Sequence, residues 1–424
     1  MKRYLGGIDW VINALDYLGR KRSGIGNISQ IVLELDGRVN EKDLRKRLNN
    51  CLQLIPALSG YPARSLNLCP YWKIDSKPYP LTLNVLHLEG NVDFTQAQIV
   101  FQEYLDKPFK NKKEHLVFNL VYCIKKTYFG MIFDHRLMDA RGAEAFLNML
   151  GQEPPEFSPL NSLVEPSNLN KWLDKFRAGR KINRVFLRLT AGKPRVLPLS
   201  INSSKSRLKV FAFNTQESVV ITDNSYKSAG YLMFMPYLLA KSIVCLHNIF
   251  EQRKILPADY LIPVSVDNRP VALVKKAPFF NHLSFFLFRI KTEEAYDFVV
   301  VLDKIKKQMY EQVKMGLPEA IKEASFLIRI APLPLVDFFV RVMTKGEAAS
   351  FAFSFVGESV LNLDTFCGAR VSNLLHLPRV PLPPGLGIFF NQFQGKLNAT
   401  FSSVEGLLSE SEVRQVSEYL KGLV

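Results

Sequence analysis

The sequence of 424 residues lacks most of the short patterns that mark disulfide frameworks or nucleotide chemistry. Its five cysteines are scattered without a CxxC pair, at Cys51, Cys69, Cys123, Cys245 and Cys367. An odd, unpatterned set in a chain of this length indicates free thiols in a reducing compartment. Neither a GxSxG elbow nor a glycine-rich phosphate loop is present. The usual signals of a serine hydrolase and of a nucleotide-binding enzyme are therefore both missing.

Two further absences concern secretion and membranes. The first residues carry no apolar core of the kind that a signal peptide needs, because aspartates interrupt them. The most apolar run, residues 231–250, contains Pro236, Lys241 and His247, which favours a buried helix over a membrane span. Residues 326–343 also carry charges, although they could lie on a membrane surface. We expect a cytoplasmic protein, with peripheral membrane contact left open.

The composition that remains is typical of a globular protein. Hydrophobic residues make up 47% and charged residues 22% of the chain, which excludes a disordered protein. A chain of this length is too long for one compact core, and two lobes of roughly 200 residues each are expected. Residues 151–170, rich in Pro, Ser and Asn, mark the boundary. We assign 1–165 to an N-terminal lobe, 166–210 to a crossover segment and 211–424 to a C-terminal lobe.

Both lobes mix strand and helix patterns, which predicts an α/β (α+β) fold with a mixed sheet flanked by helices in each lobe. In the first lobe the predicted strands are 30–37, 81–88, 115–124 and 127–135, and the predicted helices are 40–55, 94–105 and 140–150. In the second lobe the predicted strands are 260–267, 282–290, 350–357, 387–394 and 396–404. Helices are predicted over 225–252, across about 293–344 and over 409–423.

The formal net charge of +16 is concentrated in the crossover segment, where residues 171–209 contain twelve Lys or Arg against one acid. Its first part predicts a helix with an apolar side (Trp172, Phe176, Ile182, Phe186, Leu189) and a basic side (Lys171, Lys175, Arg184, Arg188). The basic side is either a solvated face or a site for coenzyme phosphates, an acidic carrier protein or anionic lipid. No nucleic-acid motif accompanies the charge, so nucleic acid is not an expected partner.

The stretch "FDHRLMDARG" carries the strongest chemical signal. His135 leaves an apolar strand between Asp134 and Asp139, just before a predicted helix. A catalytic zinc needs about three protein ligands, and no further His- or Cys-rich stretch supplies them, so a metal site is not expected. A general base needs a neutral imidazole that is held in place and shielded from water. From the pattern alone, a catalytic histidine and a structural loop histidine remain equally compatible.

The same stretch resembles the HHxxxDG signature of the CoA-dependent acyltransferase superfamily, which includes chloramphenicol acetyltransferase, wax ester synthases, BAHD acyltransferases and condensation domains of nonribosomal peptide synthetases. The resemblance continues, in the expected order, through "GGIDWVINALDYLG", "LIPVSVDNRP", "FFNHLSFFLF", "FAFSFVGES" and "GIFFNQFQGKLNATFS". Two positions depart from the signature. Asp134 replaces its first histidine, and Ala140 replaces the glycine after the aspartate.

The resemblance implies a role for each matching residue. His135 would take a proton from an acceptor hydroxyl or amine as it attacks a thioester carbonyl, without an acyl-enzyme. Asp139 would pair with Arg269 across the fold, and a simple helix N-terminal acid is an equally compatible interpretation. Asp134, Asn281 and Ser354 would lie along the substrate channel. The other histidines are interpreted as structural, namely His87, His115, His247, His282 and His376.

The implied fold has two chloramphenicol acetyltransferase-like lobes with a tunnel between them. Acyl-CoA or the phosphopantetheine thioester of an acyl carrier protein would be the donor, with no permanently bound cofactor, and a monomer is expected. Two alternatives stay open. One is a catalytically silent paralogue that binds thioesters or carriers, for which Asp134 is the one hint. The other is a membrane-surface or polyanion-binding protein, based on the crossover segment.

Overall fold

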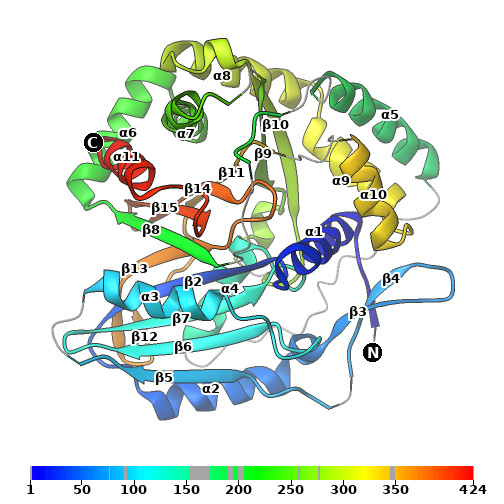
Figure 1. The fold of residues 1–424 in the computed structure, drawn as a ribbon. Coiled ribbons are helices and arrows are strands. Elements are labelled where there is room, and N and C mark those ends of the chain that lie inside the picture. The colour runs from blue at the N-terminus through cyan, green and yellow to red at the C-terminus, as the bar shows by residue number, and fades with distance from the viewer. Residues whose placement is uncertain are drawn as a thin grey trace.

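The computed structural model describes residues 2–75, 77–89, 93–152, 171–189, 194–198, 205–255, 258–275, 277–343 and 349–423. Two six-stranded sheets, each with parallel and antiparallel pairs, form two lobes that lie one above the other (Figure 1). A small third sheet joins β1 (Lys2–Tyr4), β4 (Pro70–Lys73) and β3 (Tyr61–Arg64). The predicted fold class, two lobes each with a mixed sheet and flanking helices, is confirmed.

The first sheet has the order β12-β13-β2-β7-β6-β5. Its strands are β12 (Thr365–Phe366), β13 (Ala369–Pro378), β2 (Ile28–Asp36), β7 (Lys126–Asp134), β6 (Leu116–Tyr122) and β5 (Thr82–His87). Helices α2 (Glu41–Leu54) and α4 (Ala140–Gly151) pack on one face, and α3 (Phe94–Leu105) packs on the other. Consecutive residues of the central strand β2 enter these two different cores, Ile31 and Leu33 on one face and Val32 on the other, so the middle of the strand is apolar on both faces.

The second sheet has the order β10-β9-β11-β14-β15-β8. Its strands are β10 (Leu283–Ile290), β9 (Tyr260–Asp267), β11 (Ala352–Glu358), β14 (Leu386–Phe393), β15 (Lys396–Val404) and β8 (Ser206–Ala212). Helices α6 (Thr215–Ala229), α7 (Phe234–Gln252), α8 (Phe298–Lys314) and α11 (Glu410–Lys421) contribute to the largest hydrophobic core with these strands. The apolar run at 231–250 thus lies mainly in the buried helix α7, as predicted.

The two sheets do not divide the chain at the expected positions. Strand β13, assigned to the C-terminal lobe, pairs instead with β2 of the first sheet over nearly its whole length. Strand β8, from the end of the crossover segment, forms the edge of the second sheet beside β15. A strand made of "ARVSNLLHLP" has a weak local pattern, and only its long-range pairing identifies it.

Helix breaks also differ from the prediction. The helix expected over 225–252 is two helices, because Gly230 adopts φ 97° and α6 and α7 meet at 93°. No single helix in the described part of the chain has the length and apolar character to cross a membrane, and the bent α6–α7 pair meets that test only when both helices are taken together. The region 293–344 contains α8, α9 (Leu317–Ile328) and α10 (Leu333–Met343), separated at Gly316 and around Pro332.

The orientation predicted for the basic helix is wrong. In α5 (Trp172–Leu189), Lys175 is buried, whereas Trp172 and Phe176 are exposed. The buried side packs on α9, where a Cβ at Gly179 would lie 3.0 Å from Leu327 Cδ1. The small residue lets the two helices approach closely on that side, which turns the aromatic side outward. The side chains of Phe186, Arg188 and Leu189 lie outside the described residues.

Candidate active site

The histidine of the signature lies in a tight loop between β7 and α4, at the seam of the two lobes. All residues of β7 after Lys126 are buried, which fixes the strand that leads into the loop. The backbone N–H of His135 donates to the carbonyl of Asn27 at 3.0 Å. Its carbonyl accepts from Asn281 Nδ2 of the second half at 2.8 Å. Both sides of the His135 peptide unit are therefore held by other parts of the fold.

Asp139 and Arg269 are brought together, 130 residues apart in the chain. Arg269 Nη2 donates to Asp139 Oδ1 at 2.6 Å, and both side chains are almost fully buried. The same carboxylate accepts from the backbone N–H of Gly142 at 2.8 Å and of His282 at 3.0 Å. Asp139 is thus an ion-pair partner and the N-cap of α4 at once, so the two interpretations of this residue describe one geometry.

Close packing makes this junction sensitive to side-chain size. A Cβ on Gly142 would lie 2.2 Å from the carbonyl oxygen of Pro278. Glycine is therefore required at this position, where the first turn of α4 touches the second half of the chain. Ala140, which replaces the glycine of the signature, occupies the first position of the helix and is half-buried without disturbing it.

The ring of His135 suits a general base. It is half-buried, and its Nδ1 atom is buried without a hydrogen-bond partner among the described residues. Burial lowers the pKa of the imidazole below its ordinary value of 6.5, and the carboxylates of Asp139 and Asp134 offset only part of this effect. The ring is therefore neutral at physiological pH and able to accept a proton. Phe133 packs against it edge-on, with ring centroids 5.2 Å apart.

Asn281 lies beside this loop, but its contacts are with protein. Its Nδ2 holds the His135 carbonyl, and its backbone N–H donates to Asp9 Oδ1 at 3.0 Å. The preceding residue, Phe280, adopts φ 68° and donates its N–H to the carbonyl of Leu137 at 2.6 Å. This segment therefore clamps the histidine loop from the second half of the chain.

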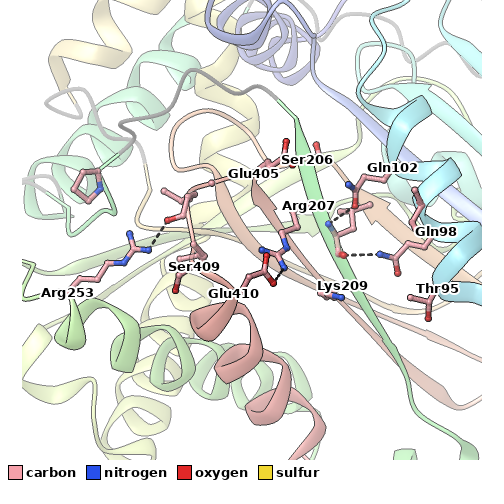
Figure 2. A pocket seen from close by; sticks show the side chains of 16 residues that line it. Thr95, Gln98, Gln102, Ser206, Arg207, Lys209, Arg253, Glu405, Ser409 and Glu410 are labelled. Carbon is pink, nitrogen blue, oxygen red and sulfur yellow. Dashed lines mark hydrogen bonds and ion pairs between the residues drawn. The ribbon is translucent and has the colours of Figure 1, made fainter.

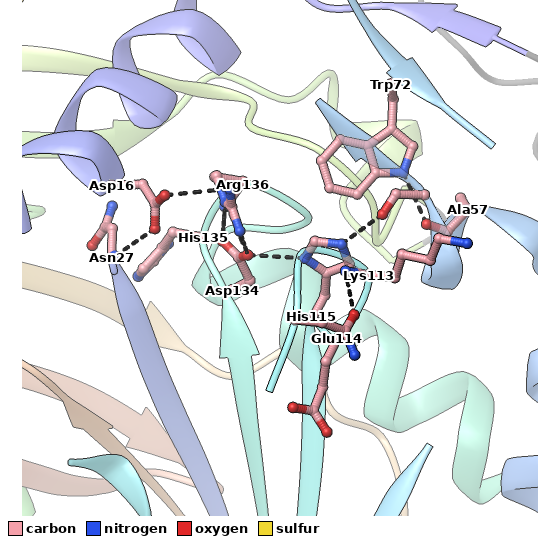
Figure 3. A network of polar contacts seen from close by, with 12 residues as sticks. Asp16, Asn27, Ala57, Trp72, Lys113, Glu114, His115, Asp134, His135 and Arg136 are labelled. Atoms are coloured by element: carbon pink, nitrogen blue, oxygen red, sulfur yellow. Dashed lines mark hydrogen bonds and ion pairs between the residues drawn. The ribbon is translucent and has the colours of Figure 1, made fainter. Parts of the chain in front are cut away.

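Asp134 does not lie in a substrate channel, contrary to the expectation. Its carboxylate is fully buried and accepts from Arg136 Nη2 at 2.6 Å and from His115 Nδ1 at 2.9 Å (Figure 3). Arg136 also lies 3.3 Å from Asp16 of α1 (Gly7–Ser23). Burial raises the pKa of Asp134, but Arg136 and His115 outweigh it and hold the pKa below its ordinary value. The aspartate that departs from the signature, Asp134, is thus part of a buried ionic network.

A second buried histidine lies near the site, and the sequence analysis interpreted it as structural. His376 of β13 bonds Glu144 of α4 through Nε2 at 2.8 Å, and it contributes to the lowered pKa of His135. Glu144 also accepts from Arg141 Nη1 at 3.1 Å and from the backbone N–H of Val360 at 2.9 Å. No local motif marks this pair, because its members are 232 residues apart.

Ser354 lies on strand β11 of the second sheet. Its hydroxyl lies 3.4 Å from that of Ser265, on the neighbouring strand β9. The residues that the structure gathers around His135 are Asp139, Arg269 and Asn281, with Asp134 behind them. Within the described part of the chain no group of three or more His, Cys, Asp or Glu side chains is arranged to hold a metal ion.

An open cleft of about 800 Å³ lies at a different contact between the lobes (Figure 2). It is bounded by α3, β8 and the start of α11, and Arg207, Lys209 and Arg253 line it together with Glu405 and Glu410. Arg207 Nη2 and Glu410 Oε2 lie 2.5 Å apart, so these opposite charges partly satisfy each other. The lining includes none of the residues around His135, so this cleft is separate from the candidate active site.

Comparison with known proteins places this geometry in a known fold. No protein-family profile matches the chain, and no curated protein matches its sequence. The TRI3 trichothecene 15-O-acetyltransferase from Fusarium sporotrichioides is similar over 100% of this chain and 94% of its own, with a TM-score of 0.71 at 11% identity. The first condensation domain of the CDA synthetase is similar over 100% and 95%, with a TM-score of 0.67 at 13% identity.

A third similar structure was solved with a coenzyme A ligand. A variant of the starter condensation domain of rhizomide synthetase RzmA, in complex with C8-CoA, is similar over 100% of this chain and 94% of its own, with a TM-score of 0.68 at 12% identity. These proteins belong to the CoA-dependent acyltransferase superfamily. The chain therefore has the fold of that superfamily, as the sequence resemblance predicted.

Proposed function

We propose that this protein is an acyltransferase that moves an acyl group from a thioester donor to a hydroxyl or amine acceptor, with His135 as the general base. The observation that carries the proposal is the state of His135: a neutral, half-buried imidazole whose backbone is clamped by Asn27 and Asn281. The fold shared with acetyltransferases and condensation domains supports acyl transfer in general.

The proposed reaction needs no covalent enzyme intermediate. His135 removes the proton from the acceptor hydroxyl or amine while the acceptor oxygen or nitrogen attacks the thioester carbonyl. The new C–O or C–N bond forms, the C–S bond breaks, and the imidazolium returns its proton to the leaving thiolate. Asp139 and Arg269 act as positioning residues, because they hold the loop and touch neither reactant in this scheme.

The donor would be acyl-CoA or an acyl group on the phosphopantetheine arm of a carrier protein. The C8-CoA complex of the rhizomide domain supports the first choice for this fold. Donor and acceptor would reach His135 along the seam between the lobes, from opposite sides. We propose that the protein acts in the reducing cytoplasm, since its five cysteines are all free thiols. A resident cofactor is not part of the scheme.

Thiol release tests the proposal. The protein is incubated with a panel of acyl-CoAs and acylated carrier proteins, with and without alcohol and amine acceptors, and free thiol is followed. His135→Ala should lower turnover about 10²–10⁴-fold, the usual contribution of a general base. The matched control is His87→Ala, which removes an exposed histidine at the far edge of the first sheet and should leave turnover unchanged.

Four results of this assay are informative. Acceptor-dependent thiol release that requires His135 supports acyl transfer. Release without an acceptor would instead indicate a hydrolase. Donor binding by calorimetry without any turnover across the panel would establish the silent paralogue, and retention of most activity by a folded His135→Ala variant would remove the proposed base.

A further inference from the structure

The outer surface of α5 carries two different stripes. Trp172, Leu173 and Phe176 are 41%, 72% and 56% exposed, although large apolar side chains of this kind are usually buried. Arg180, Lys181 and Arg184 are also exposed on the same helix. At 100° per residue these cations lie next to the apolar stripe, with Arg180 and Arg184 on the side turned away from α9. A helix with adjacent aromatic and basic stripes is typical of an interfacial helix.

Helix α10 presents a second apolar stripe. Leu335, Phe338, Phe339 and Val342 are all exposed, and their spacing of three, one and three residues puts them on one face. Its opposite face is anchored, because Val336 packs in a small core with Trp10 and Ala14. The exposed stripe is therefore held in position by packing on α1 rather than left loose.

The two stripes lie in one region of the surface. Helices α5 and α9 run antiparallel: Lys175 lies near Glu323 and Phe326, and Lys181 near Gly316. The start of α5 therefore lies beside the end of α9, which leads directly into α10. Figure 1 shows α5, α9 and α10 together on the outer side of the molecule. Ile328 and Ile330, between the two stripes in the chain, are exposed as well.

Helix α5 carries mainly cationic charge. The acid on α5, Asp174, is paired with Arg177 at 3.5 Å. The acid on α10, Asp337, is buried and bonded to Lys21 of α1 at 3.2 Å, and Lys21 itself remains half-exposed. Apolar side chains are thus bordered by cations from two helices.

We propose that α5 and α10 form a docking face for an anionic lipid bilayer, in which Trp172, Leu173, Phe176, Leu335, Phe338 and Phe339 enter the interface while the cations of α5 contact lipid headgroups. A soluble acidic protein would satisfy the cations but leave the aromatic side chains unexplained. A second copy of the chain would bring like charges together, which opposes association. An anionic bilayer matches both stripes at once. The proposal is independent of acyl transfer, because binding requires no turnover.

Vesicle binding and tryptophan emission test the proposal on the full chain. Of the three tryptophans, Trp10 and Trp72 are 4% and 0% exposed, so Trp172 is the residue whose emission should respond to a membrane. We expect cosedimentation with phosphatidylcholine vesicles that contain phosphatidylserine, weaker binding to phosphatidylcholine alone, and a decline as salt rises. The emission should shift to shorter wavelength on binding, and Trp172→Phe should abolish the shift.

Two variant pairs separate the contributions. Arg180→Glu with Arg184→Glu should weaken binding at least tenfold, since each cation near an anionic surface contributes roughly fivefold. Phe338→Ser with Phe339→Ser should weaken it at least tenfold through lost apolar insertion. Matched controls on the first lobe are Lys42→Glu with Lys46→Glu for charge, and Leu54→Ser with Ile99→Ser for exposed apolar side chains. Both controls should bind as the wild type does.

Several outcomes would overturn the proposal. Absence of binding to the phosphatidylserine vesicles would do so, as would binding that both variant pairs leave intact. A concentration-dependent dimer that Phe338→Ser with Phe339→Ser dissolves would assign the face to a second copy. Binding of an acidic carrier protein that Arg180→Glu with Arg184→Glu abolishes, without vesicle binding, would assign it to a soluble partner.

Discussion

Replacement of Asp139 by alanine should destabilise the protein by about 3–5 kcal/mol, because it removes one member of a buried ion pair. The carboxylate accepts three hydrogen bonds, from Arg269 Nη2 at 2.6 Å and from the backbone N–H groups of Gly142 and His282 at 2.8 and 3.0 Å. Its loss leaves all three donors without this acceptor and uncaps α4. Loss of a helix cap alone typically costs about 1 kcal/mol.

The remaining contacts of Arg269 limit how much stability Asp139→Ala can lose. Asp267 Oδ1 still lies 2.9 Å from Arg269 Nη1, so the guanidinium keeps one carboxylate. The cost of the broken ion pair and the cost of the lost helix cap both come from the Asp139 carboxylate, so the two values cannot simply be added. Burial raises the pKa of Asp139, but Arg269 and the backbone donors outweigh it and keep the pKa below 3.8. This stabilisation is therefore present above that value and lost as pH falls through the depressed pKa.

Urea unfolding at neutral pH measures the effect. Circular dichroism and tryptophan fluorescence are followed for the wild type, Asp139→Ala, Arg269→Ala and the double variant, and coincident transitions are required before free energies are compared. The double variant should lose much less than the sum of the single losses. Asp267→Ala is the control, since removal of this partly exposed carboxylate should lower the free energy of unfolding by only about 1 kcal/mol.

A free energy of unfolding for Asp139→Ala within about 1 kcal/mol of the wild-type value would refute this prediction, because a broken buried ion pair costs more than that. Additive losses in the double variant would equally show that the two side chains stabilise the fold independently.

Three further predictions follow from the site. In a pH–rate profile, kcat/KM should decline at low pH with an apparent pKa below 6.5, because burial of His135 lowers the pKa of its imidazole. An apparent pKa above 6.5 would contradict the assignment of His135 as a base that is neutral at physiological pH. Asp134→His, which completes the family signature, should destabilise by about 3 kcal/mol, because an imidazole cannot replace the carboxylate that holds Arg136 and His115; unchanged urea stability would show that the network is dispensable. Gly142→Ala should lower the free energy of unfolding by about 1–3 kcal/mol or more, because its Cβ would meet the Pro278 carbonyl. Ala140→Gly should lower it by no more than about 1 kcal/mol. Equal melting temperatures for the two variants would show that close packing at Gly142 does not limit side-chain size.

Most helices and strands of this fold could be predicted from the local sequence. The strand predicted over 396–404 is β15 (Lys396–Val404), and the helix predicted over 94–105 is α3 (Phe94–Leu105). Asp93 and Ser409 cap their helices through their own side chains. Such signals lie within a few residues of the element that they define, so no knowledge of the fold is needed to find them.

The sequence by itself also marked His135 as the candidate general base, because a histidine between two aspartates after an apolar strand resembles a known signature. Tertiary structure decided what each of them touches. Asp134 turned out to hold Arg136 and His115 rather than substrate, and α5 packs through Lys175 and Gly179 rather than its aromatic residues. These outcomes depend on the shape and charge of segments far away in the chain. Local periodicity shows that a helix has an apolar side, but only the neighbouring helix decides which side is buried.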